Sequence, residues 1–258
     1  MRLKVIACKV LYREISLLSA NSEHIIDVSY LRQGFHDQPQ YLNELLQNEI
    51  DRIDRCEDVY SYASDDEEQD FDAILLGYGL CSNAVTGLHS ERYKLVIPRA
   101  HDCATLLLGS KEAYRQIFDS ASGGIYWYSA GWNENAVMPS RGRVEKLRVE
   151  YEEKYGEDNA EYLMEMEQNW LKEYKSCTFI DWPALHNDKQ IAFTKDCAEY
   201  LDWEYRQLPG DDSLLRAFLS GEWDDERFLV VEPGRRIAQS YDAGVLGIAK
   251  DEESSIME

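Results

Sequence analysis

The stretch KLVIPRAHDC (94–103) joins an apolar run of strand length directly to charged and reactive side chains. An unbroken run such as LVIP is typical of a strand buried on both faces, as in a parallel sheet. A strand exit needs a turn residue and some polarity, but it does not need a histidine and a cysteine two positions apart. The stretch therefore predicts a buried strand that ends in a functional loop.

Similar apolar segments alternate with helical ones on both sides of this strand. Further strands are predicted at LKVIAC (3–8), HIIDVSYL (24–31), FDAILLGYG (71–79) and GGIYWYSAG (123–131), and helices at 11–20, 39–53 and 105–118. Strands that alternate with helices at this spacing indicate a mostly parallel sheet flanked by helices on both faces.

The second half resumes the alternation after a long, charged segment of helical composition. Strands are predicted at 177–183, 203–209 and 227–234, and helices at 187–203 and 213–221. The predicted fold is thus α/β, with two Rossmann-like halves joined by a helical segment. The expected division is a first half over 1–140, a helical bridge over 141–175, a second half over 176–250 and an acidic tail over 251–258.

Composition and charge narrow the functional classes. The chain has 258 residues, of which 44% are hydrophobic, enough for a buried core. Its formal net charge of −22 argues against nucleic acid and anionic membranes as general partners. Since neither a signal peptide nor a long apolar run is present, a cytoplasmic protein is expected. In that reducing compartment, the six cysteines are expected to be free thiols or metal ligands.

The reactive side chains follow the ends of the predicted strands. Cys8 ends the first, His36 follows the second, Cys81 follows the third, and His101 and Cys103 follow the fourth. The carboxyl ends of parallel strands share one edge, and ligands bind in the crevice there. We therefore expect these residues, distant in sequence, to form one site.

Thiolate and imidazole ligands suit zinc or iron, including an iron–sulfur cluster, better than magnesium or calcium. A metal is predicted at Cys81, His101 and Cys103, with Cys8 as a fourth ligand. The alternative for Cys8 is a role in core packing, and for His36 a hydrogen bond within its loop.

Other residues are candidates because of their place beside this loop or their chemistry. Asp102 and Arg99 are the candidate catalytic residues. Asp102 is expected to orient a ligating histidine or bind substrate, and Arg99 to attract a carboxylate or phosphate. Gly77 and Gly79 would let the backbone approach a cofactor closely. Trp127 lies in an aromatic segment that forms either a core strand or a stacking wall for a planar ligand.

Several segments resemble a known family. IACKVLYREI (6–15), GYGLCSNAVTGL (77–88), VIPRAHDCATLLLGS (96–110) and YWYSAGW (126–132), in this order, resemble a prokaryotic family catalogued as domain of unknown function 1638. The segment at 208–234 is similar to the carboxyl-terminal signature of that family. The resemblance implies a setting in anaerobic bacteria and archaea, often beside corrinoid-dependent methyl transfer.

The HDC tripeptide (101–103) is similar to the His-x-Cys pair of zinc-dependent corrinoid methyltransferases, although here the lone Cys81 precedes the pair. This likeness favours a metal-binding enzyme that activates a small-molecule thiol for methyl transfer, with a corrinoid protein as a further candidate partner. One alternative is a protein that binds or delivers a metal, cluster or corrinoid without turnover. The other is a structural metal site, or cysteines that only pack.

Overall fold

A computed structural model describes residues 1–34, 38–57, 70–81, 83–121, 124–240 and 244–249. The chain forms two compact units. The first unit combines Met1–Lys111 with Asp211–Glu258, and the second unit is the continuous stretch Glu112–Gly210. The second unit is therefore inserted into the first.

The first unit is built around a five-stranded sheet. Its strand order is β2 (Ile25–Leu31), β1 (Arg2–Cys8), β3 (Ala73–Gly77), β4 (Leu95–Pro98) and β8 (Phe228–Val231). The first four are parallel, and β8 pairs antiparallel with β4. Every residue of β3 and β4 is buried, as expected for central strands of a sheet covered on both faces.

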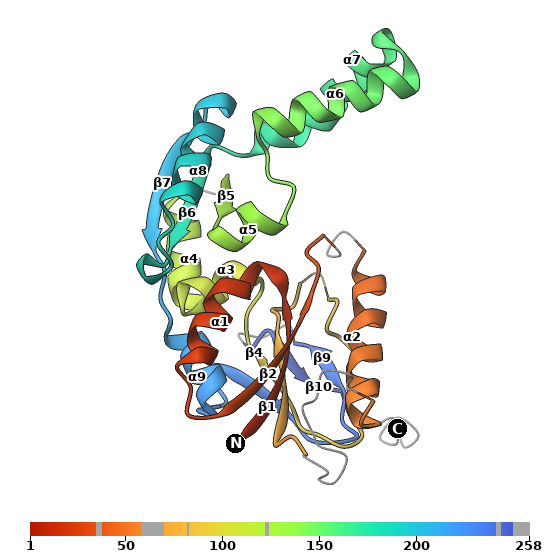
Figure 1. Cartoon of the computed structure of the whole chain (residues 1–258), viewed down its shortest axis with the longest axis vertical. Coiled ribbons are helices and arrows are strands. Elements are labelled where there is room, and N and C mark those ends of the chain that lie inside the picture. Colours follow the sequence, from red (N-terminus) through yellow and green to blue (C-terminus); the bar gives the residue numbers. More distant parts are fainter. Residues whose placement is uncertain (35–37, 58–69, 82, 122–123, 241–243, 250–258) are drawn as a thin grey trace, which may run out of the picture. The chain divides into compact units, whose positions relative to one another are not determined.

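Helices cover both faces of this sheet. Figure 1 shows α1 (Tyr12–Ala20) and α9 (Ser213–Ser220) on one side and α2 (Pro39–Asp54) on the other. The helix α2 begins with proline in its first turn, a position that needs no N–H donor. Four apolar side chains at helical spacing bury its inner face: Leu42, Leu46, Ile50 and Ile53. The remaining elements are η1 (Lys9–Leu11), α3 (Cys103–Leu108) and the hairpin of β9 (Ile237–Gln239) and β10 (Leu246–Ile248).

The strand order creates a switch point between β1 and β3. From β1 the chain moves outward to β2 on one side, and then returns to β3 and β4 on the other. In open parallel sheets the loops at such a point leave in opposite directions, which opens a crevice at the carboxyl ends of the strands. Any ligand site of the first unit is therefore expected at the ends of β1, β3 and β4.

The second unit has its own three-stranded parallel sheet. The order is β5 (Ile125–Tyr128), β6 (Ser176–Asp181) and β7 (Glu204–Pro209). Its other elements are α4 (Lys111–Ser120), α5 (Ala130–Asn135), η4 (Pro183–Leu185) and α8 (Asp188–Leu201), which packs on β6 and β7. The core consists of buried side chains from the strands, from α8 and from the segment after α5: Tyr128, Met138, Cys177, Phe179, Cys197 and Ala198.

A helical hairpin connects β5 to β6. It consists of α6 (Arg141–Tyr155) and α7 (Glu157–Gln168), which lie side by side in Figure 1, followed by η3 (Asn169–Glu173). Gly156 separates the two helices with a φ of +81°, a conformation that suits glycine. Arg143 and Glu167 form an ion pair of 2.6 Å across the hairpin.

The α/β class and the mostly parallel sheet flanked by helices are confirmed, but the chain divides differently from the expected 1–140, 141–175 and 176–250. The strand β5 pairs with β6 rather than joining the first sheet, and β8 joins the first sheet rather than the second. The single helix expected at 105–118 is two helices, because Gly109 adopts a left-handed conformation with a φ of +81° and ends α3. No helix among the described residues is long and apolar enough to span a membrane.

Candidate functional site

Three cysteine thiols meet at the carboxyl edge of the sheet in the first unit. Cys8 is the last residue of β1, Cys81 lies in the loop after β3, and Cys103 opens α3 after β4. The thiols of Cys8 and Cys81 both act on the acidity of the Cys103 thiol, so the three side chains are neighbours. The exposed fractions of the three residues are 2%, 9% and 5%. We call these residues the cysteine cluster.

Main-chain hydrogen bonds hold two of the cluster's loops together. The Leu80 N–H donates to the Ala100 carbonyl at 2.8 Å, and the Cys81 N–H donates to the His101 carbonyl at 3.1 Å. The loop after β3 thus pairs with the loop after β4 beyond the end of both strands. This pairing places Cys81 beside Cys103 without any help from a side chain.

Two glycines make the close packing of these segments possible. A β-carbon at Gly79 would lie 2.7 Å from the Asp102 nitrogen and 2.8 Å from the Ala100 oxygen. A β-carbon at Gly77 would lie 2.6 Å from that of Ala7, its partner in the register of β1 and β3. The close backbone approach at these two glycines is made to other parts of this chain. Cofactor binding by the two glycines stays a prediction.

The backbone of Cys81 has an unusual conformation for a residue with a side chain. Its φ is +45°, near the left-handed region that non-glycine residues rarely adopt. The Cys81 carbonyl accepts a hydrogen bond from the Ala84 N–H at 3.2 Å. Such conformations persist where surrounding contacts impose them, and they are common at functional sites.

The thiols of the cluster differ in acidity. The Cys103 thiol donates to the Cys8 sulfur, and this hydrogen bond lowers the pKa of Cys8 by stabilising its thiolate. Hydrogen bonds to Cys8 and Cys81, together with burial, raise the pKa of Cys103 well above its usual value. Burial also raises the pKa of Tyr78, and negative charge on the three nearby cysteines adds to this shift. Tyr78 is a neighbour of the cluster that the spacing of reactive residues did not reveal.

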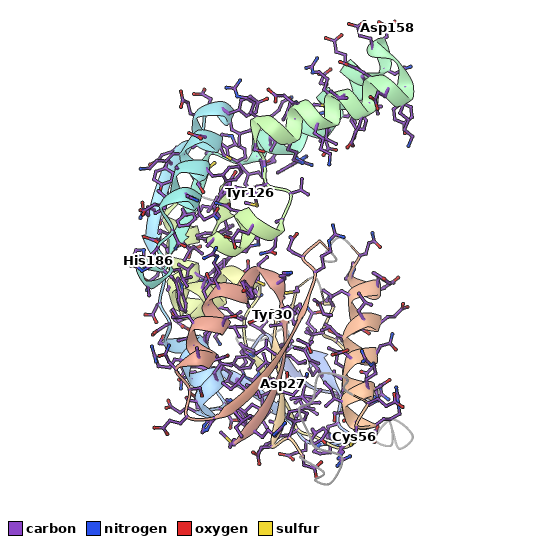
Figure 2. The ribbon with its side chains drawn as sticks, viewed as in Figure 1. Asp27, Tyr30, Cys56, Tyr126, Asp158 and His186 are labelled. Carbon is purple, nitrogen blue, oxygen red and sulfur yellow. The ribbon has the colours of Figure 1, made fainter. Side chains whose placement is uncertain are left out.

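The other three cysteines lie in the second core or at the surface. Burial raises the pKa of Cys177 to about 11 and that of Cys197 to about 12, so both are neutral members of the second core. Cys56 is exposed (Figure 2), and its sulfur accepts a hydrogen bond from Arg92 Nη1 at 2.8 Å. All six cysteines are free thiols in the structure.

His101 is not gathered into the cluster as the cysteines are. Its side chain is exposed, and its carbonyl makes the contact with Cys81. Among the residues that the structure describes, no group of three or more His, Cys, Asp or Glu side chains has the arrangement of a metal site. The ligand roles of the three clustered cysteines and His101 therefore stay predictions. His36 lies outside the described residues.

Asp102 and Arg99, the expected catalytic residues, both have structural partners. The Asp102 carboxylate caps α3 by accepting from the Thr105 N–H at 3.1 Å and the Thr105 hydroxyl at 3.2 Å. The Arg99 guanidinium donates to main-chain carbonyls of the returning carboxyl-terminal segment, those of Asp225, Phe228, Gly244 and Leu246. These contacts hold the loop in place, and a catalytic role for either side chain stays a prediction.

Trp127 belongs to the second unit, on β5, and not to the unit that contains the cysteine cluster. Its ring lies 5.8 Å from that of Tyr114, between centroids, at an interplanar angle of 34°. Trp127 is half-buried, which fits either a packing residue or a wall of a local pocket. Its contact with a cofactor stays a prediction.

Comparison with known proteins gives one match. A family model described as "Protein of unknown function (DUF1638)" matches residues 30–219, more than half of the chain. No curated protein and no solved structure matches. The matched range includes Cys81 and Cys103 and all of the second unit, whereas Cys8 precedes it.

Proposed function

Because the chain belongs to the DUF1638 family, whose description assigns no activity, we propose a function from the cysteine cluster: the first unit binds zinc or iron through Cys8, Cys81 and Cys103. The supporting observation is that three buried cysteines gather at one edge of the sheet, where the thiols of Cys8 and Cys81 act on that of Cys103. Three strand ends supply one soft ligand each, at the edge where open parallel sheets bind their ligands.

The chemistry of the cluster is compatible with a metal ion. Tetrahedral zinc–sulfur bonds of about 2.3 Å place two ligand sulfurs about 3.8 Å apart. Among the described residues the cysteines do not have the arrangement of a metal site as they stand, so metal binding would require their side chains to rotate toward a common centre. The ion would replace the thiol protons of the three cysteines.

Three protein ligands leave one tetrahedral position for a substrate, as in catalytic zinc sites. With the His101 side chain exposed, we propose that a small-molecule thiol occupies this position. The metal would lower the thiol pKa and hold a thiolate at neutral pH. That thiolate would attack the methyl group of a donor, forming a carbon–sulfur bond as the bond between methyl and donor breaks. A corrinoid is the proposed donor, on the family resemblance alone.

Changing Cys103 to serine should abolish stable metal binding. Wild-type protein purified without oxygen should contain about one zinc or iron per chain, whereas the variant should retain metal at least about tenfold more weakly, because a central thiolate is lost. Elemental analysis and competition with a chelator measure this difference.

The matched control is Cys56→Ser, which removes an exposed thiol from the same unit. It should keep its metal, and circular dichroism should show both variants folded. A wild-type protein that stays metal-free after zinc and iron supplementation would exclude the proposed site. Equal metal loss in the two variants would do the same.

Thiol activation has its own test, which separates an enzyme from a carrier. In cobalt-substituted protein, homocysteine should add a sulfur-to-cobalt charge-transfer band, because its thiolate enters the open position. Homoserine, the hydroxyl analogue, should leave the spectrum unchanged. If no thiol alters the spectrum of a fully metallated sample, metal binding stands and the thiol-activation proposal falls in favour of delivery.

A further inference from the structure

The second unit contains a pocket with a volume of about 350 Å³ that is independent of the cysteine cluster. Val144 of α6, Leu171 and Lys172 of η3, Tyr200 of α8, and Trp203 contribute to its lining. This volume falls within the usual range for small-molecule sites. The pocket is thus large enough for a small organic ligand.

Aromatic packing holds one wall of the pocket in place. The Trp203 ring contacts Tyr126 and Tyr174, with centroid distances of 6.1 Å and 5.8 Å. Tyr126, marked in Figure 2, also contacts Trp170 at 5.8 Å. A ring fixed by several aromatic neighbours loses little conformational freedom when a ligand stacks on it. The wall therefore favours a flat, apolar ligand surface.

Among the described residues that line the pocket, the charged side chain is positive, in a chain whose formal net charge is −22. Of the residues with a described position, no Asp or Glu is in the pocket lining, whereas Lys172 is. The Arg141 guanidinium lies 4.8 Å over the ring of Tyr200, another lining residue. Arg141 and Val144 are three positions apart on α6, so they share one helix face.

The two cations differ in their contacts. Lys172 Nζ donates to Asn169 Oδ1 at 2.7 Å, an uncharged partner that leaves the ammonium charge uncompensated. Within the described part of the chain, the Arg141 guanidinium forms neither a hydrogen bond nor an ion pair, although acidic residues outnumber basic ones almost two to one. A guanidinium on an aromatic face, with its donors unused, suits a ligand anion.

We propose that this pocket binds a small planar aromatic anion, such as an aromatic carboxylate. The ring would pack against Trp203 and Tyr200, and the carboxylate would face Arg141 and Lys172. This combination uses both properties of the pocket, since a neutral ring would leave the cations unpaired and a small inorganic anion would leave the aromatic wall uncovered. The proposal does not depend on metal binding in the first unit.

The probes are 2-naphthoate and its neutral amide, 2-naphthamide, which match in shape and differ in charge. Titration of the full chain by calorimetry or ligand-observed NMR should give a dissociation constant of about 1 mM or below for naphthoate. Naphthamide should bind about tenfold more weakly. Equal binding of the two probes would overturn the proposal, as would no binding of naphthoate at about 10 mM.

Two variants of exposed arginines on the same helix show where the charge acts. Arg141→Gln should weaken naphthoate binding about tenfold and leave naphthamide unaffected, because only the anion uses the guanidinium. Arg148→Gln, which removes the same charge about two helical turns farther along α6, should change neither. If the two arginine variants weakened naphthoate binding equally, the effect would be nonspecific charge attraction, and the proposed anion site would be refuted. Tyr200→Leu should weaken both probes, since it removes a ring surface.

Discussion

Replacing Gly79 with alanine should lower the free energy of unfolding by about 3 kcal/mol. The added β-carbon would meet the Asp102 nitrogen at 2.7 Å, the Ala100 oxygen at 2.8 Å and the His101 carbonyl carbon at 2.9 Å. All three are backbone atoms, so no side-chain rotation relieves the clash. The two loops would have to separate, and the main-chain hydrogen bonds between them would break. Urea denaturation measures the loss.

Gly142→Ala is the matched control, because a β-carbon there meets nothing within 4 Å and the residue lies in the first turn of α6. Alanine should be neutral or stabilise by up to about 1 kcal/mol at that position. The Gly79 variant should also lose metal, although no cysteine has changed. A Gly79→Ala protein as stable as wild type would show that the loops are not packed as described.

Changing Asp27 to asparagine should destabilise the first unit by about 3 kcal/mol. Lys4 lies in the middle of β1 with an exposed fraction of 0%, and its ammonium is 3.3 Å from a carboxylate oxygen of Asp27 on β2. The two residues are direct register partners, and Figure 2 marks Asp27. Removing the negative charge leaves a buried positive charge beside a weaker partner. Asp27 is 20% exposed, so solvent moderates the effect.

A second substitution separates charge from packing. Lys4→Met in the Asp27→Asn background removes the buried charge while keeping a long side chain, and should recover most of the lost stability. Thermal or urea unfolding of the wild type and the single and double variants completes the comparison. A double variant as unstable as the single one would assign the loss to packing.

The strands were predictable where burial leaves an unbroken apolar run, as in β3 and β4. Their partners were less predictable, because the local pattern of a strand does not identify which strand it pairs with. The run at 227–234 looks the same in a parallel or an antiparallel pair, and its partner β4 lies more than a hundred positions earlier. For the same reason, the place of β5 in the alternation predicts the first sheet, whereas β5 pairs with β6 in the second.

The meeting of Cys8, Cys81 and Cys103 followed from one rule, that parallel strands end at one edge. The orientation of His101 does not follow from that rule, because it depends on the main-chain pairing of two loops. The cap formed by Asp102 on Thr105 was readable from their spacing. The contacts of Arg99 could not be predicted from the sequence, since its acceptors belong to a segment that follows the whole second unit in the chain.

The return of the chain at Asp211 has a consequence for biosynthesis. Asp211 donates its N–H to the Leu107 carbonyl at 3.0 Å, so the two crossings into the inserted unit are joined. On the ribosome, β4 emerges long before β8, and its outer edge stays unpaired while residues 112–210 are translated. An open strand edge is a template for pairing with other nascent chains. If the inserted unit folds as soon as it is made, Leu107 and Asp211 come together early, and the interval in which the edge of β4 is exposed becomes shorter. Slow translation through 112–210 lengthens that interval and is therefore expected to increase aggregation.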